Sequence, residues 1–374
     1  MDLSLTPAQE MLKGAVRQFV DQEYPKETLL EIAAAMNEST HDSWHKLADT
    51  GWLGIVIPEE FGGEGGSLTD AGVLFEELGR GPVPGPHLSS GVLSALTVLE
   101  GGNNQQKSEW LPKICRGEEL LIPAITESDY GWYEDDVMSV LTDNGENWVL
   151  NGKKAYVFDG ASATHFLCTV KSPESSQVGL VRVLAGSQGV KVRSLSGFAW
   201  NMSEVTFSDV DVDQSDVLGG TLSGGWEALE KAIIKTIPIL SAYQTGGCQA
   251  VYEVSVGYSR TRIQFGTPIG RFQRVQDHII NLVNQLDAAR WTSNEALWKL
   301  DSGREPYDSV HLAKAVSSEA YVQACDHAHE VHAGVASMTD YGLTLHTTAS
   351  RTLYTYLGDP RFHRHRLAEA LGIL

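Results

Sequence analysis

The sequence is poor in cysteine and in positive charge, and both shortages narrow its possible functions. Its four cysteines are scattered over 374 residues without a C-x-x-C pair, which predicts reduced core residues rather than a disulfide framework. Lys and Arg together number 28 against 48 Asp and Glu, so the formal net charge is −20. An acidic surface without basic clusters repels phosphate backbones, so we expect no nucleic-acid partner.

Long apolar runs and nucleotide-binding motifs are missing from the sequence as well. No stretch reaches the roughly 18 uninterrupted apolar residues of a membrane span, and the first residues, Met1 to Thr6, lack the basic and then apolar pattern of a signal peptide. A G-x-G-x-x-G or P-loop pattern is not found, which leaves a Rossmann or kinase fold without support. The sequence therefore predicts a cytoplasmic protein without membrane contact.

Helical periodicity marks both ends of the chain. Thr6 to Gln9 combines an N-cap threonine, a proline at the first helical position and a capping-box glutamine. A second helix is predicted over residues 70–78, before a loop rich in Gly and Pro. Beyond the middle of the chain, long helices are predicted over residues 226–260, 274–302 and 307–333 and near 343–356.

The middle of the chain has the period of β-strands. Asn151-Gly152 lies between two β-rich runs, which predicts a hairpin turn there. Further strands are predicted over residues 165–170, 179–184 and 204–212. Helices, then a sheet, then helices indicate an α+β fold with segregated units. We expect domains at residues 1–119, 120–222 and 223–374.

Five motifs in this order resemble the acyl-CoA dehydrogenase family. They are Gly51 to Gly63, Glu76 to Arg80, Thr126-Glu127, Asn151 to Lys154, and Arg262 with Phe265 to Gly270 and Gln273. The resemblance implies an N-terminal helical domain, a central β-barrel or sandwich domain and a C-terminal four-helix bundle. It also implies FAD, acyl-CoA substrates and a tetramer built as a dimer of dimers.

The residue that would act as the family's base is missing. Desaturation of an acyl thioester needs a carboxylate to remove the α-proton while the flavin accepts a hydride from the β-carbon. The family's usual glutamate position corresponds to Leu357, and the alternative position of some branches corresponds to Thr236. Neither side chain can remove that proton.

By comparison with the family's pattern, this chain has also lost several of the residues that would contact its own flavin. Thr126 and Gly131 match the family, although Thr126 could equally cap a turn. Trp132 and Phe158 stand where the family has hydroxyl donors. Asp359 comes two residues after the lost base, at a position that would contact the nucleotide. A carboxylate there would be repelled by the pyrophosphate.

Residues that reach a neighbouring subunit's flavin are retained in contrast. The resemblance assigns Arg262, Phe265 and Gln273 to the adenine and pyrophosphate end of that flavin, with Gly334 from a half-matching Gln-x-x-Gly-Gly segment. Alternatively, Arg262 is an ordinary surface arginine without a role in flavin binding. The histidines near residue 330 lack acidic or cysteine partners at ligand spacing, so we expect no metal.

The leading hypothesis is a non-catalytic subunit that completes a partner's flavin site. Branches of the family that act on steroid side chains pair a catalytic subunit with such a depleted companion, which suggests an α2β2 heterotetramer that passes electrons to an electron-transfer flavoprotein through the partner. A second hypothesis is a homomeric acyl-CoA flavoenzyme with a relocated base, for which Asp359 and Glu330 are the carboxylates to examine. A third is a flavin-free acyl-CoA-binding or scaffold protein.

Overall fold

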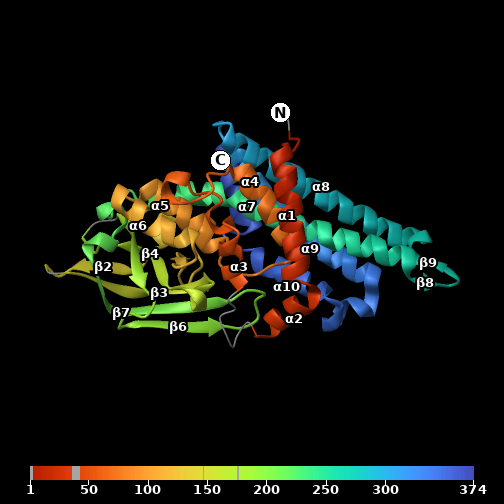
Figure 1. The fold of residues 1–374 in the computed structure, drawn as a ribbon, viewed down its shortest axis with the longest axis horizontal. Helices are drawn as coiled ribbons and strands as arrows, with labels where there is room; N and C mark the ends of the chain where they lie inside the picture. Colours follow the sequence, from red (N-terminus) through yellow and green to blue (C-terminus); the bar gives the residue numbers. More distant parts are fainter. Residues whose placement is uncertain (1–2, 36–42, 146, 175–176) are drawn as a thin grey trace. The chain divides into compact units, whose positions relative to one another are not determined.

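The computed structural model describes residues 3–35, 43–145, 147–174 and 177–374 (Figure 1). The chain divides into two compact units. One comprises residues 1–34, 68–84 and 237–374 and is helical; the other comprises residues 35–67 and 85–236 and contains the large sheet. The α+β class and the helix–sheet–helix order are thereby confirmed, whereas the three domain boundaries stay a prediction.

Helices make up most of the described chain. The α-helices are α1 (Pro7–Glu23), α2 (Lys26–Ala35), α3 (Ser43–Asp49), α4 (Leu68–Arg80), α5 (Ala95–Gly101), α6 (Asn104–Cys115), α7 (Gly225–Thr261), α8 (Gln273–Asp301), α9 (Tyr307–His332), α10 (Leu343–Leu353) and α11 (Pro360–Ala370). A π-helix, η3 (Ser89–Ser94), precedes α5. The short 3-10 helices are η1 (Trp52–Gly54), η2 (Glu59–Phe61), η4 (Glu134–Asp136), η5 (Gly160–Ser162), η6 (Gln214–Asp216), η7 (Leu218–Gly220), η8 (Ile269–Arg271), η9 (Ala333–Ser337) and η10 (Thr339–Tyr341).

Within the helical unit, α8, α10 and α11 pack on α9, and α4 packs on α1 and α8. The predicted start of α1 is confirmed, because Gln9 N donates to Thr6 Oγ1 at 3.2 Å and Thr6 N donates to Gln9 Oε1 at 2.9 Å. Helix α4 meets α7 backbone to backbone. A Cβ on Gly79 would lie 1.9 Å from the carbonyl oxygen of Tyr243, so only glycine permits this approach.

The strands of the sheet unit form one seven-stranded sheet. They are β1 (Leu121–Ala124), β2 (Val140–Asp143), β3 (Trp148–Phe158), β4 (His165–Lys171), β5 (Val178–Leu184), β6 (Val190–Leu195) and β7 (Met202–Val212). Their order is β1-β4-β2-β3-β7-β6, with β5 also paired to β4. The β1–β4 and β2–β4 pairs are parallel and the other pairs are antiparallel.

The predicted hairpin turn at Asn151-Gly152 is wrong. Strand β3 runs through both residues, and its register against β7 shifts between Leu150 and Gly152. Asn151 Nδ2 donates to the Asp209 carboxylate at 2.9 Å, and Asp209 N donates to Asn151 Oδ1 at 2.9 Å. The Asn-Gly pair therefore lies at a β-bulge, which the Asn151 side chain ties to Asp209 on the facing strand.

Candidate functional site

A small hairpin follows α7 and carries the first of the predicted site residues. Strands β8 (Ile263–Gln264) and β9 (Thr267–Pro268) pair in antiparallel fashion directly after Arg262. The two residues between them, Phe265 and Gly266, have φ angles of +52° and +77°. Positive φ at both central residues is the geometry of a tight two-residue hairpin, which glycine adopts freely and phenylalanine adopts under strain.

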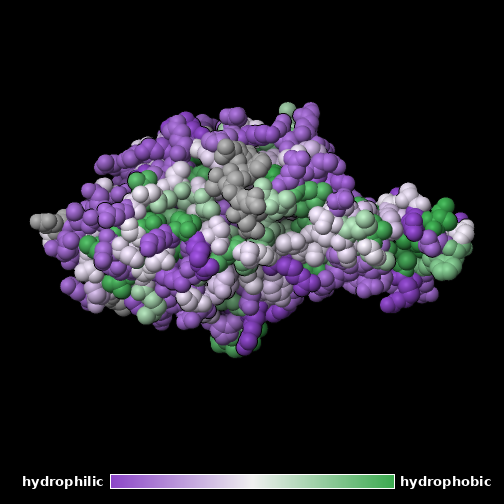
Figure 2. Space-filling model, turned by 90° about the horizontal axis from the view of Figure 1, so that it is seen from below, coloured by the Kyte–Doolittle hydropathy of each residue, from purple (hydrophilic) through white to green (hydrophobic). Residues whose placement is uncertain are grey.

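The tip of this hairpin is apolar and exposed. The side chain of Phe265 is 92% exposed and that of Ile263 is 60% exposed. The Phe265 ring contacts the Phe272 ring edge to face, with 5.9 Å between the centroids. Figure 2 shows hydrophobic atoms over this hairpin, at the right of the view. Large exposed apolar side chains grouped in this way indicate a surface that meets another molecule.

Arg262 and Gln273 flank the hairpin, and both are exposed. Gln273 is the first residue of α8, next to Phe272. Within the described part of the chain, neither the Arg262 guanidinium nor the Gln273 amide forms a hydrogen bond or an ion pair. Both polar groups are therefore available to a partner or ligand, together with the Phe265 ring.

Gly334 lies at the same end of the helical unit. It follows the end of α9, where the ring of His332 stacks on Tyr258 of α7 with 4.4 Å between centroids. The structure thus brings Arg262, Phe265, Gln273 and Gly334 to one end of the bundle. Ala333, which stands at a glycine position of the resembled segment, has φ +52° and ψ −139°, a region that suits glycine.

The histidines at this end are engaged with polar groups other than metal ligands. His332 is buried, with Nδ1 2.8 Å from the Tyr341 hydroxyl and Nε2 3.2 Å from the Ser255 hydroxyl. His329 Nε2 lies 2.8 Å from Thr347 Oγ1. Among the residues that the structure describes, no group of three or more His, Cys, Asp or Glu could hold a metal ion.

The turn at the missing base is tightly held. Leu357 is buried, with φ +60°, and its carbonyl oxygen accepts a hydrogen bond from His363 Nε2 at 2.8 Å. Asp359 caps α11 by accepting from Phe362 N at 2.7 Å. A carboxylate that caps a helix through a backbone N–H favours a structural reading of Asp359 over a relocated base.

A buried lysine supports the same turn. Lys314 Nζ donates to Ser318 Oγ at 2.6 Å and to the carbonyl oxygens of Leu353 and Tyr354 at 3.2 and 3.3 Å. These carbonyls end α10, so the amine occupies a helix C-terminus, where positive charge is favourable. Burial lowers the pKa of Lys314 to about 7, yet three acceptors for three N–H groups favour the ammonium form.

Thr236 marks the family's alternative base position, and Glu330 is the second carboxylate candidate. Thr236 is buried inside α7, and its hydroxyl donates to the carbonyl oxygen of Ala232 at 2.7 Å. Glu330 is exposed near the C-terminal end of α9. Sixteen residues separate it from Lys314, about 24 Å at the helical rise, so it is remote from the Leu357 turn.

In the sheet unit, the Thr126-Glu127 motif has a structural role. Thr126 is buried, and its hydroxyl donates to the carbonyl oxygen of Ala155 at 2.6 Å. Glu127 forms an ion pair with fully buried Lys154 at 2.7 Å and also accepts from Ser139 N at 2.9 Å. This buried pair ties the loop after β1 to β3, which sequence reasoning did not predict.

Aromatic side chains occupy the positions of the lost hydroxyl donors. Trp132 contacts Tyr130 edge to face, and its buried indole N–H has no acceptor among the described residues. Phe158 is buried against Trp200. A Cβ on Gly131 would lie 2.0 Å from an Asp136 carboxylate oxygen, so packing alone explains this glycine.

Next to Phe158, Asp159 is a further ionisable residue that sequence reasoning missed. It is 3% exposed, and its carboxylate accepts from Ser89 Oγ at 2.7 Å. Burial raises the pKa of Asp159 to about 7. Ser89 is seventy residues away in the sequence, so no local pattern could have revealed the pair.

These residues fit a flavin dinucleotide on one side only. Arg262 could hold a pyrophosphate and Phe265 could cover an adenine, because both are exposed and unengaged in polar contacts. On the chain's own side, the Thr126 hydroxyl proton is already donated and Phe158 offers no donor. The Trp132 N–H is able to donate to a bound acceptor.

Comparison with known proteins identifies the family. Residues 6–118 match the model of the acyl-CoA dehydrogenase N-terminal domain, and residues 223–372 match that of the acyl-CoA dehydrogenase C-terminal domain. The acryloyl-CoA reductase (NADH) of Anaerotignum propionicum is 29% identical, over 97% of this chain and 94% of that protein.

Solved structures agree with this assignment. A glutaryl-coenzyme A dehydrogenase in complex with glutaryl-CoA is 25% identical with a TM-score of 0.92, covering 100% of this chain and 98% of that one. A chain of the ChsE4-ChsE5 complex from Mycobacterium tuberculosis shares the fold at 24% identity and a TM-score of 0.89, covering 100% of this chain and 99% of that one. With matches at both ends and one fold throughout, the chain belongs to the acyl-CoA dehydrogenase family of oxidoreductases.

Proposed function

We propose that this chain is the non-catalytic subunit of a hetero-oligomeric, FAD-dependent acyl-CoA dehydrogenase and that it completes the flavin site of a homologous partner. The observation that carries the proposal is an asymmetry. The side chains of Arg262, Phe265 and Gln273 are exposed and available to a partner. In contrast, the side-chain oxygens of Thr126, Thr236 and Asp359 form hydrogen bonds to the backbone of this chain. A subunit that also held its own flavin would need free polar groups at the positions of Thr126 and Asp359 in addition.

The chemistry divides accordingly between the two subunits. FAD, when bound, supplies the hydride acceptor for α,β-desaturation of an acyl-CoA thioester. The base belongs to the partner, because Leu357 is an alkyl side chain in a buried turn. This chain contributes a guanidinium for phosphate, an aromatic ring and an amide. We place the complex in the cytoplasm as an α2β2 tetramer that passes electrons to an electron-transfer flavoprotein through the partner.

The relatives and the family branch support a class of substrate. Relatives named for acryloyl-CoA and glutaryl-CoA support a coenzyme A thioester as substrate. The resemblance to a depleted companion subunit is to the branch that acts on steroid side chains, so a steroid side-chain thioester is our first choice. The ChsE4-ChsE5 neighbour is a complex of two proteins, but at this identity it supports the fold alone.

An alternative is a homomeric flavoenzyme. The unpaired indole N–H of Trp132 favours it, because a buried donor without an acceptor costs about 1 to 3 kcal/mol that a bound group could recover. Purified alone, such a homomer would be yellow and carry one FAD per chain.

The test is flavin stoichiometry. We expect the chain to be colourless alone and, when co-expressed with a homologous partner, to form a complex with one FAD for every two chains, measured by absorbance after denaturation. One FAD per chain in the pure homomer would refute the proposal. A colourless protein under both conditions would point to the flavin-free scaffold.

The variant Arg262→Ala tests whether this arginine contributes to FAD binding without being needed for folding. We expect FAD affinity in the complex to fall about ten- to a hundredfold, since a charge-assisted hydrogen bond is worth roughly 1.5 to 3 kcal/mol. Arg193→Ala, which removes an exposed arginine of β6, is the matched control and should leave FAD content unchanged. Equal FAD affinity in both variants would show that Arg262 is only a surface charge.

A further inference from the structure

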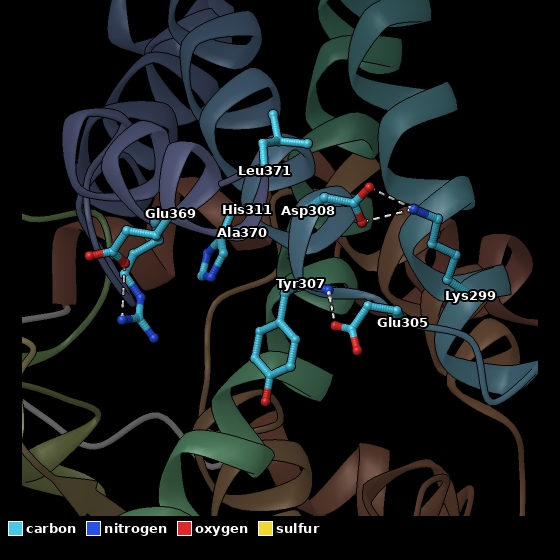
Figure 3. Close-up of a pocket in the computed structure, with 9 residues that line it drawn as sticks. Lys299, Glu305, Tyr307, Asp308, His311, Glu369, Ala370 and Leu371 are labelled. Atoms are coloured by element: carbon cyan, nitrogen blue, oxygen red, sulfur yellow. Dashed lines mark hydrogen bonds and ion pairs between the residues drawn. The ribbon is translucent and has the colours of Figure 1, made fainter. Parts of the chain in front are cut away.

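A cavity lies within the helical unit and is lined by residues other than those of the hairpin end. It has a volume of about 470 Å³ and is bounded by the end of α8, the start of α9 and the end of α11 (Figure 3). That volume is within the range of small-molecule sites. The polar groups on its wall are Lys299, Glu305, Tyr307, Asp308, His311, Arg366 and Glu369.

His311 is the buried polar group of this wall. It is 4% exposed, and its Nδ1 lies 2.9 Å from Nδ1 of His363. His363 Nε2 lies 2.8 Å from the Leu357 carbonyl oxygen, which can only accept, so Nε2 carries the proton. In a neutral His363, Nδ1 is then an acceptor, and His311 must donate to it from Nδ1.

The tautomer of His311 follows from this chain of contacts. With its proton on Nδ1, Nε2 of a neutral His311 bears a lone pair, and no group of the described chain donates to it. Burial lowers the pKa of His311 to about 4, which keeps the ring neutral at physiological pH. The cavity therefore presents an acceptor to which no described side chain donates, and this acceptor repels carboxylates and phosphates and suits a ligand with an N–H or O–H group.

The surrounding charges select among such ligands. Lys299 donates to both carboxylate oxygens of Asp308, at 2.8 and 3.0 Å, and Arg366 pairs with Glu369 at 3.3 Å. Among the residues that the structure describes, Glu305 forms no ion pair, and its carboxylate accepts a long hydrogen bond, 3.4 Å, from Tyr307 N. The Tyr307 ring, 40% exposed beside it, is a surface over which a cation is attracted.

We propose that this cavity binds a small organic ammonium ion, with one N–H donating to His311 Nε2 and the charge balanced by Glu305 and the Tyr307 ring. The site is independent of the flavin partnership, because every group that forms it lies in this chain.

Three probes of equal length test the proposal on the full chain. We expect 1-butylamine to bind at neutral pH and butyrate not to bind, with 1-butanol weaker than the amine, as measured by saturation-transfer NMR. In histidine-labelled protein, butylamine should shift the imidazole nitrogen signal of His311. Butyrate binding as tightly as butylamine, or no binding by any probe, would overturn the proposal.

Variants locate the bound amine. Glu305→Gln, at the cavity wall, should weaken butylamine about two- to fivefold, and Tyr307→Leu should also weaken it. Glu27→Gln, on α2 and away from the cavity, is the matched control and should have no effect. His311→Phe should abolish binding; if that variant fails to fold, the two wall variants decide. Unchanged affinity in both wall variants would place the amine elsewhere and refute the site.

Discussion

Phe265, Ala333 and Leu357 adopt positive φ angles of 52°, 52° and 60° although none is glycine. Such conformations cost roughly 1 to 2 kcal/mol per residue, because Cβ approaches the backbone. Each of the three lies at a turn that the family resemblance marked as functional. Strain at such positions persists only where the surrounding structure enforces it, as the His363 contact does for Leu357.

Ala333→Gly should stabilise the protein by about 1 kcal/mol. Its methyl group is exposed, so removing it loses little packing while relieving the strained φ and ψ angles. Urea unfolding measures the change. Ala288→Gly, at an exposed position in the interior of α8, should destabilise by a similar amount. The same sign for both variants would contradict the strain at Ala333.

Asp159→Asn should remove a pH-dependent loss of stability. The folded-state pKa of Asp159 is raised from 3.8 to about 7, so the folded state binds the proton more tightly and stability falls as pH rises through this window. Three units correspond to about 4 kcal/mol. We expect the variant to exceed the parent in unfolding free energy at about pH 8 and to match it near pH 4. Parallel pH curves would contradict the assignment.

Sequence reasoning at this scale was strongest where one residue decides the chemistry. The absence of a carboxylate at Leu357 and Thr236 needs no structure. Pairs formed by the tertiary fold, such as His311 with His363 and Asp159 with Ser89, are separated by 52 and 70 residues. Neither member carries a local pattern that would predict the other.

Among the elements, those with strong periodicity or a cap were predicted well. Helices α4, α7, α8 and α9 begin and end close to the predicted residues, and α1 begins where its cap was predicted. Helix α11 was missed because its Arg- and His-rich sequence has little apolar periodicity. Strand β6 was missed because it lies at the sheet edge and most of its side chains are exposed, so it lacks the alternation of a half-buried strand.

A buried ion pair ties the loop after β1 to strand β3. Lys154→Met should therefore cost about 3 to 5 kcal/mol, since Glu127 would keep a partly buried, uncompensated charge. Thermal unfolding measures the loss. Adjacent Lys153 is half-exposed and pairs with Glu204, so Lys153→Met should cost at most about 1 kcal/mol. Equal costs would show that the Glu127 pair contributes nothing beyond a surface contact.

Across the whole molecule, buried histidines predict sensitivity to acid. Among the residues that the structure describes, burial lowers the pKa of seven histidines, and the shift is large for six of them, namely His87, His165, His311, His332, His346 and His363. Each is neutral when folded and takes up a proton on unfolding below its usual pKa, so stability is lost as pH falls from 6.5 towards 4.

The free energy of unfolding is expected to fall steeply with decreasing pH. Six fully shifted groups would contribute about 8 kcal/mol per pH unit, comparable with the total stability of a typical domain. Melting temperature measured from about pH 7 to pH 4 should fall sharply below pH 6. A flat profile across this range would mean that these histidines are protonated in the folded state.

The hairpin of Ile263 and Phe265 has a consequence for how the protein is made. A newly synthesised copy exposes this apolar tip until a partner covers it, and two such copies can bury their tips against each other instead. Synthesis of the two subunits at the same time, from adjacent reading frames, would shorten the time for which the tip is exposed. Overproduced on its own, the chain should lose soluble yield with time, and Phe265→Ser should restore it.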